Sequence, residues 1–406
     1  MTAPDPWAAL DDVTASPAAV DAQAAELVAE LELDDVRRAA GLTSWLVRRA
    51  CLDGSTALPA GTLAAALRGF GITDPVPGVG AADDAGRVVA IPEERLLAPP
   101  EVAAAEETVA EELGRLLVEP RATGPPLSDR AAALELACSA GVLVVVDDPR
   151  ASVQAWLDDL AAADVVVIEA AHRLELADAA TVLTGLGDGH RVVLLGDPAQ
   201  LQPLGPGRLF ADVLASGVVP VVELPPESSA GGHGSPLQEL AAAVRAGRLP
   251  PVDPAQHEVV VTPVADVAQA ITRTVQLVTS SVPRVLAVGP QDTRVLTVRT
   301  GGALGALALQ RELATAGSTV EASAVHSVAG QRFEAVVLVV PAEAAGSLSR
   351  SLLLSVLAMT GRHLSIVHQA GGALAEAVTH RPHPPRRTRL AALLRECVLG
   401  PDEGGD

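Results

Sequence analysis

The sequence predicts an α/β protein in which a small, mainly α-helical domain precedes two domains, each built around a parallel sheet. Three observations support this fold class. The chain has 406 residues, which is enough for two or three domains. Short apolar runs alternate with helical patterns from residue 141 onward, as in parallel sheets that are covered on both faces. Two segments rich in Pro, 119–129 and 249–256, divide the chain.

The N-terminal domain is expected to span residues 1–120. Residues 21–38 and 101–117 carry apolar side chains near helical spacing, and Glu fills the other positions of the second stretch. Between them, "GRVVAIPEERL" (86–96) predicts a short β segment after a turn. Helices followed by a small β-ribbon fit a winged-helix or similar module, and a plain helical cap on the next domain fits equally well.

The first α/β domain is expected at residues 127–248. Its predicted strands are 141–146, 164–168, 191–195 and 219–224, and its predicted helices are 152–163, 175–186, 207–216 and 235–247. The last helix has clear ends, because Ser235 is a favourable N-cap, Pro236 suits the first turn and Gly247 stops the helix.

The second α/β domain is expected at residues 257–380. Its predicted strands are 258–262, 284–288, 319–325, 334–340 and 364–368, and its predicted helices are 264–278, 302–315 and 349–359. Residues 381–406 form a basic and then acidic tail that includes a short helix. The basic residues of this tail are expected to be solvated, with weak phosphate binding as the second interpretation. They are Arg381, Arg386, Arg387 and Arg389.

The composition argues against strong nucleic-acid binding. The chain contains no Lys, Asn or Tyr, and 29 Arg face 50 acidic residues, for a net charge of −21. Such a chain repels phosphate backbones unless its Arg residues gather on one face. Aromatic residues make up 1% of the sequence, which leaves few platforms for stacking bases. A GC-rich genome is the simplest explanation of this composition.

The sequence predicts a cytoplasmic protein without membrane contact. No apolar run reaches the ~20 residues that a transmembrane helix needs, and the first residues do not resemble a signal peptide. Three widely spaced cysteines, Cys51, Cys138 and Cys397, fit reduced thiols better than a disulfide framework or a zinc site.

The most informative stretch for chemistry is "HRVVLLGDPAQLQPLGPG" (190–207). A predicted strand ends at Gly196 and Asp197, and Gln200 follows. Gly196 permits close approach of the backbone to a ligand, and polar side chains at this edge of a parallel sheet often bind ligands. An ordinary turn explains Gly-Asp after a strand equally well.

Five strings, in the right order, resemble the motifs of superfamily 1 DNA helicases, most closely the RecD-like group. They are "AHRL" (171–174), the stretch 190–207, "GSPLQELAAAVRAGRLP" (234–250), "AVHSVAGQRFEAVVLVVP" (324–341) and "LSRSLLLSVLAMTGRHLSIV" (348–367). The resemblance covers residues 127–395. It implies two RecA-like domains of the P-loop NTPase type, with ATP, Mg²⁺ and DNA as ligands. In the family, the residue that matches Gln200 senses the γ-phosphate.

The phosphate-binding loop of that family is degenerate here. The resemblance places it at "DDPRASVQ" (147–154), where Asp147 and Asp148 take the glycine positions. Val153 takes the position of the Lys, and Gln154 takes that of the Mg²⁺-binding hydroxyl. Two carboxylates would face the triphosphate, and the chain has no Lys to compensate.

Other working parts of the family also differ. The Mg²⁺-binding Asp is replaced by Glu169, which could still reach a metal, and the water-orienting Glu by Ala170. The arginine finger falls at Met359. The Arg of the fourth motif falls in 225–232, which contains none, and the Gln of the fifth motif aligns with Ala329, although Gln331 lies close. Because phosphoryl transfer relies on such groups together, their joint loss indicates release from catalysis.

The sequence therefore predicts a helicase-family protein that acts as a non-catalytic scaffold or regulatory subunit in DNA repair or recombination. It binds a protein partner and, at most weakly, DNA, and no cofactor is expected. His326 and Arg362 are the candidate nucleic-acid contacts, although His172 and His326 also fit structural histidines. The alternative is 5′–3′ ATP-dependent unwinding with residues supplied by a partner, and a third interpretation is DNA binding by the N-terminal module alone.

Overall fold

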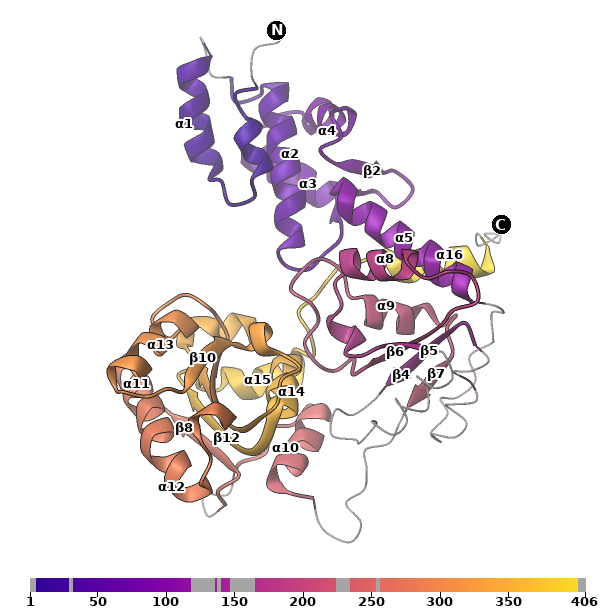
Figure 1. Ribbon diagram of the computed structural model, residues 1–406. Helices are drawn as coiled ribbons and strands as arrows, with labels where there is room; N and C mark the ends of the chain where they lie inside the picture. The colour runs from indigo at the N-terminus through magenta and orange to yellow at the C-terminus, as the bar shows by residue number, and fades with distance from the viewer. Residues whose placement is uncertain are drawn as a thin grey trace.

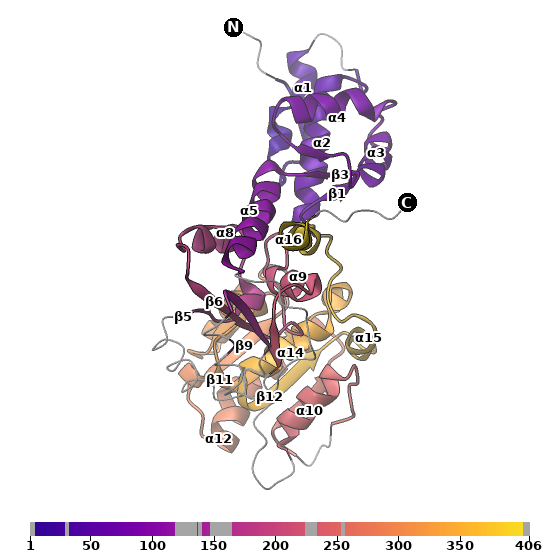
Figure 2. The ribbon, with the colours of Figure 1, turned by 90° about the vertical axis from the view of Figure 1, so that its right-hand side faces the viewer.

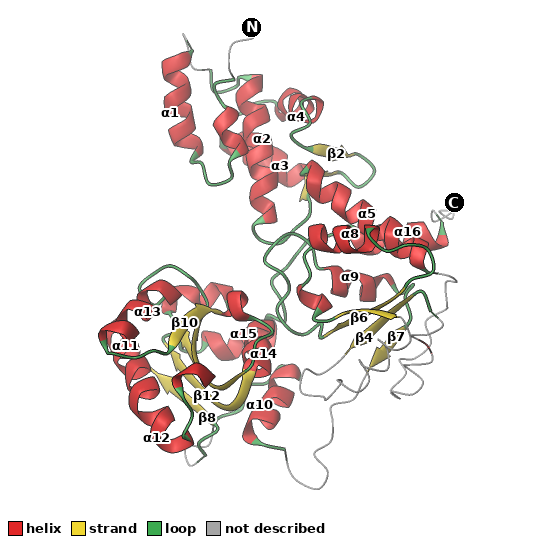
Figure 3. Ribbon diagram, viewed as in Figure 1, coloured by secondary structure: helices red, strands yellow, loops and turns green. Residues whose placement is uncertain are grey.

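The computed structural model describes residues 5–28, 32–117, 136, 140–146, 165–223, 234–252 and 256–400. Figure 1 shows a helical N-terminal region above two regions in which helices surround a sheet. Figure 3 shows that most strands gather in these two places. The predicted fold class is confirmed, because both sheets are parallel and a mainly α-helical region precedes them, as in RecA-like proteins.

The N-terminal domain is organised around the long helix α2. Its elements are η1 (Ala8–Asp11), α1 (Pro17–Leu27), α2 (Val36–Cys51), β1 (Leu58–Pro59), α3 (Ala60–Gly69), α4 (Pro75–Asp84), β2 (Val89–Ile91) and β3 (Leu96–Ala98). Strand β3 pairs antiparallel with both β1 and β2. The predicted β segment is thus present as part of a small antiparallel sheet.

The helical stretch predicted at 21–38 is wrong in its centre. Helix α1 ends at Leu27, and α2 begins at Val36. The side chain of Asp35 accepts a hydrogen bond from the N–H of Arg37 and caps the new helix. Leu27 is 68% exposed, so the apolar residues that suggested one continuous stripe do not share a buried face.

The first sheet has the strand order β5-β6-β4-β7, and all its pairs are parallel. Its elements are β4 (Val142–Val146), β5 (Val165–Ile168), α8 (Leu176–Thr184), β6 (Arg191–Gly196), α9 (Leu209–Ser216) and β7 (Val221–Glu223). Helix α5 (Pro100–Leu116) leaves the N-terminal domain and packs on α8. It contributes Val109 and Leu113 to the core beneath the sheet. The helix predicted at 152–163 lies outside the described residues.

The second sheet has the strand order β10-β9-β11-β12-β8 and is also parallel. Its elements are β8 (Val259–Pro263), α11 (Val267–Gln276), α12 (Val282–Leu286), β9 (Thr293–Thr297), α13 (Ala306–Thr315), β10 (Glu321–Ala324), β11 (Phe333–Val340), α14 (Arg350–Met359), β12 (Thr360–His368) and α15 (Ala373–His380). Strand β11 is central, and all but one of its residues are buried. This matches the apolar run that follows Glu334.

The strand predicted at 284–288 is wrong. This stretch belongs largely to helix α12, and the strand lies further along the chain, in β9. Val285 is 60% exposed, so the short apolar run does not form a buried strand. A short apolar run fits a helix as well as a strand, because its length does not reveal which side chains are buried.

Helix α10 (Pro236–Arg245) follows the first sheet in the sequence but packs on α14 of the second domain. Leu237, Leu240 and Val244 join the core of that domain. The predicted start of the helix is confirmed, since Ser235 and Gln238 form a reciprocal capping box. The predicted boundary at residue 248 assigns α10 to the first domain, whereas its packing places it in the second.

The C-terminal helix α16 (Leu390–Leu399) returns to the first domain. It lies against α5 and α9 (Figure 2), and Leu390 and Leu394 are fully buried there. This part of the segment predicted as a tail is therefore packed into a core. In the part of the chain that the structure describes, no helix is long and apolar enough to cross a bilayer.

Candidate functional site

The carboxyl edge of the first sheet faces the second domain across a cavity of about 270 Å³, called here the interdomain cleft. Glu169 and Ala170 follow β5, and Gly196 ends β6. The other wall comes from the second domain, through the turn before β11 and the end of α14. The structure thus brings together candidates from four of the predicted motifs. The lining residues are Glu169, Ala170, His172, Arg173, Leu195, Gly196, Asp197, Gln200, Gly330, Gln331, Arg332, Ala358 and Met359.

Asp197, at the end of β6, is held in a two-point ion pair. The guanidinium of Arg245 donates to both carboxylate oxygens, at 3.0 and 2.8 Å. Burial acts to raise the pKa of Asp197, which is 2% exposed, but Arg245 and the N–H donors outweigh it and keep the pKa below its ordinary value. Because Arg245 lies on α10, the pair joins the first sheet to an element packed on the second domain.

Gln200 does not extend freely into the cleft. Its side-chain nitrogen lies 3.3 Å from Asp197 Oδ2, and the side chain is buried. The next residue makes a second link between the domains, since the N–H of Leu201 donates to Ser355 Oγ of α14 at 2.8 Å. The polar side chains that the sequence singled out in this loop are thus engaged in contacts within the protein.

His172 also contacts this loop, through a hydrogen bond with Asp197. Its Nδ1 accepts the N–H of Asp197 at 3.1 Å, which places the ring proton on Nε2. Burial lowers the pKa of His172 to about 4, so the ring is neutral at physiological pH. Nε2 is buried and has no hydrogen-bond partner in the described structure. The interpretation of His172 as a structural residue is therefore supported, although one of its donors is unused.

Glu169 and Ala170 occupy the turn after β5. Glu169 is exposed and lines the cleft, so its carboxylate remains available to a cation. Ala170 has the left-handed backbone angles φ 49 and ψ 37, which are unfavourable for a residue with a Cβ. Its methyl group cannot accept a hydrogen bond from water. The turn therefore keeps an irregular geometry at a position that has no polar side chain.

Met359 and Arg362 lie on either side of the switch from α14 to β12. Met359 is 2% exposed and belongs to the core of the second domain, although it also borders the cleft. The side chain of Arg362 is 57% exposed, and its Nε lies 3.9 Å from Glu334. No cation therefore stands at the predicted finger position itself.

Two arginines that the sequence analysis did not select line the cleft from opposite sides. They are Arg173, from the first domain, and Arg332, from the second. Neither guanidinium forms a hydrogen bond or an ion pair in the structure as described. Burial lowers the pKa of Arg173, but the guanidinium remains charged at neutral pH. The cleft thus contains cationic groups where the sequence predicted a deficit of positive charge.

Several predicted site residues lie outside the described part of the chain. They are Asp147, Asp148, Val153 and Gln154 of the expected phosphate loop, together with the fourth-motif stretch 225–232. The degenerate phosphate loop therefore stays a prediction. Among the described residues, no group of three His, Cys, Asp or Glu side chains could hold a metal ion.

His326 lines a smaller cavity, which shares Arg173 with the interdomain cleft. His326 lines a space of about 120 Å³ together with Arg173 and Gln202. Burial lowers the pKa of His326, and the nearby Arg386 and Arg173 lower it further. The candidate nucleic-acid contact is therefore half-buried and neutral at physiological pH.

The expectation of a solvated basic segment is wrong for two of its arginines. Arg386 donates hydrogen bonds to the carbonyl oxygens of Pro203, Gly205 and Gly207, at 2.6 to 3.1 Å. Arg389 is 6% exposed and pairs with Glu94 and Glu107. These side chains hold the C-terminal segment in place, because each guanidinium presents several donors to fixed acceptors.

The family comparison agrees with this architecture. Residues 101–250 match the AAA domain family. The match begins near the start of α5 and includes the edge of the first sheet with Gly196 and Asp197. The predicted resemblance to a helicase-type P-loop NTPase family is confirmed by this AAA domain match.

Two solved structures of an arterivirus helicase are also similar to this chain. The crystal structure of Arterivirus nonstructural protein 10 (helicase) has 17% identity and a TM-score of 0.34, covering 71% of this chain and 72% of that one. The complex of the same protein with DNA has 16% identity and a TM-score of 0.33, covering 72% and 73%. Similarity at this level transfers no function to the AAA domain of this chain.

Proposed function

We propose that this protein is a degenerate member of the RecD-like helicase lineage that acts as a non-catalytic scaffold or regulatory subunit. Its partner would be a DNA-processing protein in repair or recombination. One observation carries the proposal. The carboxylate of Asp197, at the edge where a nucleotide-hydrolysing site needs acceptors, is engaged on both oxygens by Arg245.

ATP hydrolysis needs acceptors and donors that are free to meet the nucleotide. A metal ion requires oxygen ligands, and the attacking water requires an acceptor that orients it. In the described part of the cleft, Asp197 is paired, Ala170 has no acceptor and Glu169 is the remaining carboxylate. These residues do not fit Mg²⁺-ATP, and we assign no catalytic step to them.

The same contacts suit a scaffold. The Asp197–Arg245 pair and the hydrogen bond from Leu201 to Ser355 both connect the first sheet to elements of the second domain. A motor must change the relative position of its two domains in each cycle, whereas a scaffold gains from fixing it. The polar loop that would sense a nucleotide is here part of the connection.

Nucleotide binding and turnover by the purified full chain test the proposal. We expect no Mg²⁺-dependent ATP binding in the micromolar range, and no turnover above buffer with or without single-stranded DNA. Isothermal titration calorimetry and release of labelled phosphate measure the two quantities. Turnover by the unmodified chain that is lost in Glu169→Gln would refute a non-catalytic role.

ATP-dependent unwinding with residues supplied by a partner is the second candidate. Arg173 and Arg332 favour it, because both line the cleft without a partner of their own and guanidinium groups bind phosphate well. A catalytic partner would have to add an acceptor for water as well as a Lys. Adding the partner protein should then produce turnover that Arg173→Gln reduces, whereas a scaffold gives no such dependence.

Direct DNA binding is expected to be weak. The chain carries a net charge of −21, and its basic C-terminal side chains are partly consumed by internal contacts. Binding through phosphate contacts would show a steep decrease in affinity as salt rises. A strong, salt-sensitive affinity of the isolated chain would support the N-terminal module as a DNA-binding unit instead.

A further inference from the structure

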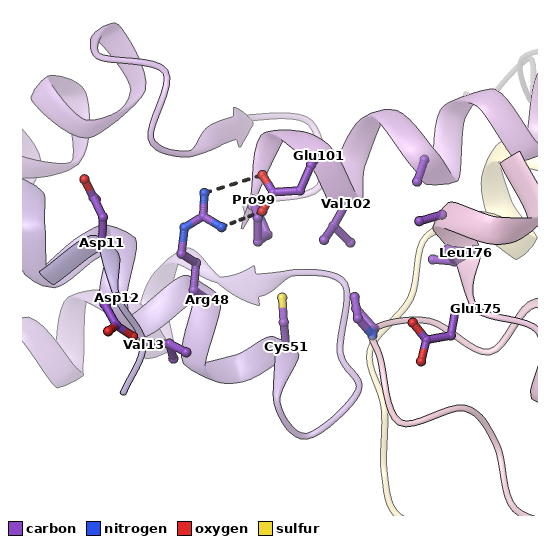
Figure 4. Close-up of a pocket in the computed structure, with 13 residues that line it drawn as sticks. Asp11, Asp12, Val13, Arg48, Cys51, Pro99, Glu101, Val102, Glu175 and Leu176 are labelled. Carbon is purple, nitrogen blue, oxygen red and sulfur yellow. Dashed lines mark hydrogen bonds and ion pairs between the residues drawn. The ribbon is translucent and has the colours of Figure 1, made fainter. Parts of the chain in front are cut away.

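A second cavity, of about 490 Å³, lies between the N-terminal domain and the first α/β domain. Figure 4 shows Cys51 and Val102 facing its middle, with Leu176 on the side of the α/β domain. Its walls are largely apolar, and its volume is in the range of sites that bind small molecules or side chains of a partner. None of its residues belongs to the interdomain cleft.

Negative charges stand at both ends of this cavity. Asp11 and Asp12 lie at one end and Glu175 at the other, as Figure 4 shows, and all three are exposed. Asp12 accepts hydrogen bonds from Thr14 that lower its pKa, so it is ionised at neutral pH. Asp11 lies 3.8 Å from Arg87, but that guanidinium is shared with another carboxylate.

The cation that lines the cavity is already neutralised. Arg48 forms an ion pair with Glu101 (Figure 4). The remaining acidic groups therefore set the sign of the local potential. An anionic ligand such as a nucleic-acid backbone would be repelled, whereas a ligand with cationic groups near its ends would be attracted.

Cys51 acts as part of the apolar wall. Its Sγ lies 3.6 Å from the carbonyl oxygen of Val47. Burial, together with the charge of Glu101, raises the pKa of the Cys51 thiol to about 11. The thiol is therefore neutral and a poor nucleophile, so non-covalent binding suits this cavity better than covalent modification.

We propose that this cavity is the docking site for a segment of a partner protein that carries apolar side chains flanked by Arg or Lys. The apolar walls bind the central side chains, and the acidic groups at the two ends bind the flanking cations. The separation of these groups favours an extended or helical segment over a small monovalent amine. The inference deepens the proposed function by stating the chemistry of the partner, and it rests on that function only for the existence of a partner.

The test uses the full chain and a fluorescein-labelled 11-residue peptide in which central Leu residues are flanked at both ends by Arg. Fluorescence anisotropy should show micromolar binding that weakens with salt. Replacing all Arg by Glu should abolish binding, and replacing all Leu by Ser should weaken it about tenfold or more, a loss of about 1.4 kcal/mol. Equal binding of the Ser peptide would contradict the apolar part of the proposal.

Variants of the protein locate the binding. Asp12→Asn combined with Glu175→Gln should weaken the peptide about tenfold, and Ala105→Trp should block it by filling the cavity. The matched control is Glu312→Gln combined with Glu343→Gln, which removes the same charge from exposed sites on the second domain. If the control pair weakens binding equally, the attraction is non-specific and the proposal fails.

Two other results would also overturn the inference. Peptide binding that Ala105→Trp leaves unchanged would place the site elsewhere, provided that circular dichroism shows the variant folded. Self-association in sedimentation experiments that Ala105→Trp abolishes would make a second copy of this chain the occupant. Neither result bears on ATP turnover, and turnover of ATP would refute the non-catalytic role without changing the peptide result.

Discussion

The two junctions of this protein use polar groups differently. At the N-terminal junction, where α5 meets the C-terminal segment, Glu106 is fully buried and accepts the N–H groups of Arg389 and Leu390 at 2.8 and 3.2 Å. At the interdomain cleft, Asp197 is paired, but Arg173 lacks a partner in the described structure. The first carboxylate is held by backbone N–H donors, whereas the second is held by a guanidinium from another element. The two junctions are therefore expected to respond differently to pH and to the loss of a single side chain.

The pH dependence of stability should distinguish the junctions most strongly. Burial raises the pKa of Glu106 from 4.5 to about 7. Between these pH values the folded state holds a proton that the unfolded state has released, so the free energy of unfolding falls as pH rises. At about 1.4 kcal/mol per pKa unit, the Glu106 contribution is about 3 kcal/mol. Glu106→Gln should remove this fall in urea unfolding, and the exposed Glu107→Gln should not.

His172 at the cleft should act in the opposite direction. Burial lowers its pKa from 6.5 to about 4, so the unfolded state binds more protons between these values. The free energy of unfolding should therefore rise with pH across this window, by about 3 kcal/mol at most. His172→Gln should flatten the rise. If Glu106→Gln and His172→Gln both keep the pH profile of the unmodified chain, protonation of these two side chains is not linked to folding.

Breaking the ion pair at the cleft should have the next largest effect. Arg245→Gln leaves the buried carboxylate of Asp197 without its cation, which costs several kcal/mol when both partners are buried. Because the Arg245 side chain is 42% exposed, we expect a smaller loss of about 2 kcal/mol in the free energy of unfolding. Arg362→Gln is the control, since its 3.9 Å contact is exposed and worth under about 0.5 kcal/mol.

The turn at Ala170 should give a small effect of the opposite sign. Gly tolerates the left-handed backbone that Ala170 adopts, so Ala170→Gly should raise the free energy of unfolding by about 0.5 kcal/mol. Ala180→Gly, inside α8, should lower it by about 1 kcal/mol. Thermal unfolding of both variants tests this. Destabilisation by Ala170→Gly would mean that the methyl group makes packing contacts that outweigh the strain.

Restoring two lost residues should have no effect on catalysis. Val153→Lys combined with Ala170→Glu supplies the cation and the acceptor that the helicase resemblance implies at these positions, but leaves the predicted loop glycines and arginine finger unrestored. We expect no ATP turnover above the unmodified chain in a phosphate-release assay. Measurable turnover would show that these two positions alone had silenced the site.

Much of the fold could be predicted because its strands are long apolar runs between clear turns. β6 and β11 follow directly from this pattern, and the capping residue Ser235 fixed the start of α10. The sequence could not show that α10 packs on the second domain, because its apolar face would suit either core. The error at 284–288 has the same origin, since a short apolar run does not specify which side chains are buried.

The site was predicted in part. Gly196, Asp197 and Gln200 could be found because they follow a strand at the edge where parallel sheets bind ligands. Arg245 could not be linked to Asp197, because 48 residues separate them and only tertiary packing brings them together. The sequence signal for Arg173 was its position three residues after Ala170, which alone does not distinguish a cleft residue from a surface one.

The packing of α16 has a consequence for the synthesis of the chain. Leu390 and Leu394 complete a core whose other members come from α5, the first sheet and the helices beside it. A ribosome makes these earlier segments long before residues 390–399 emerge. Throughout that interval the nascent first domain exposes an apolar groove between α5 and α9, which is vulnerable to aggregation unless a chaperone covers it.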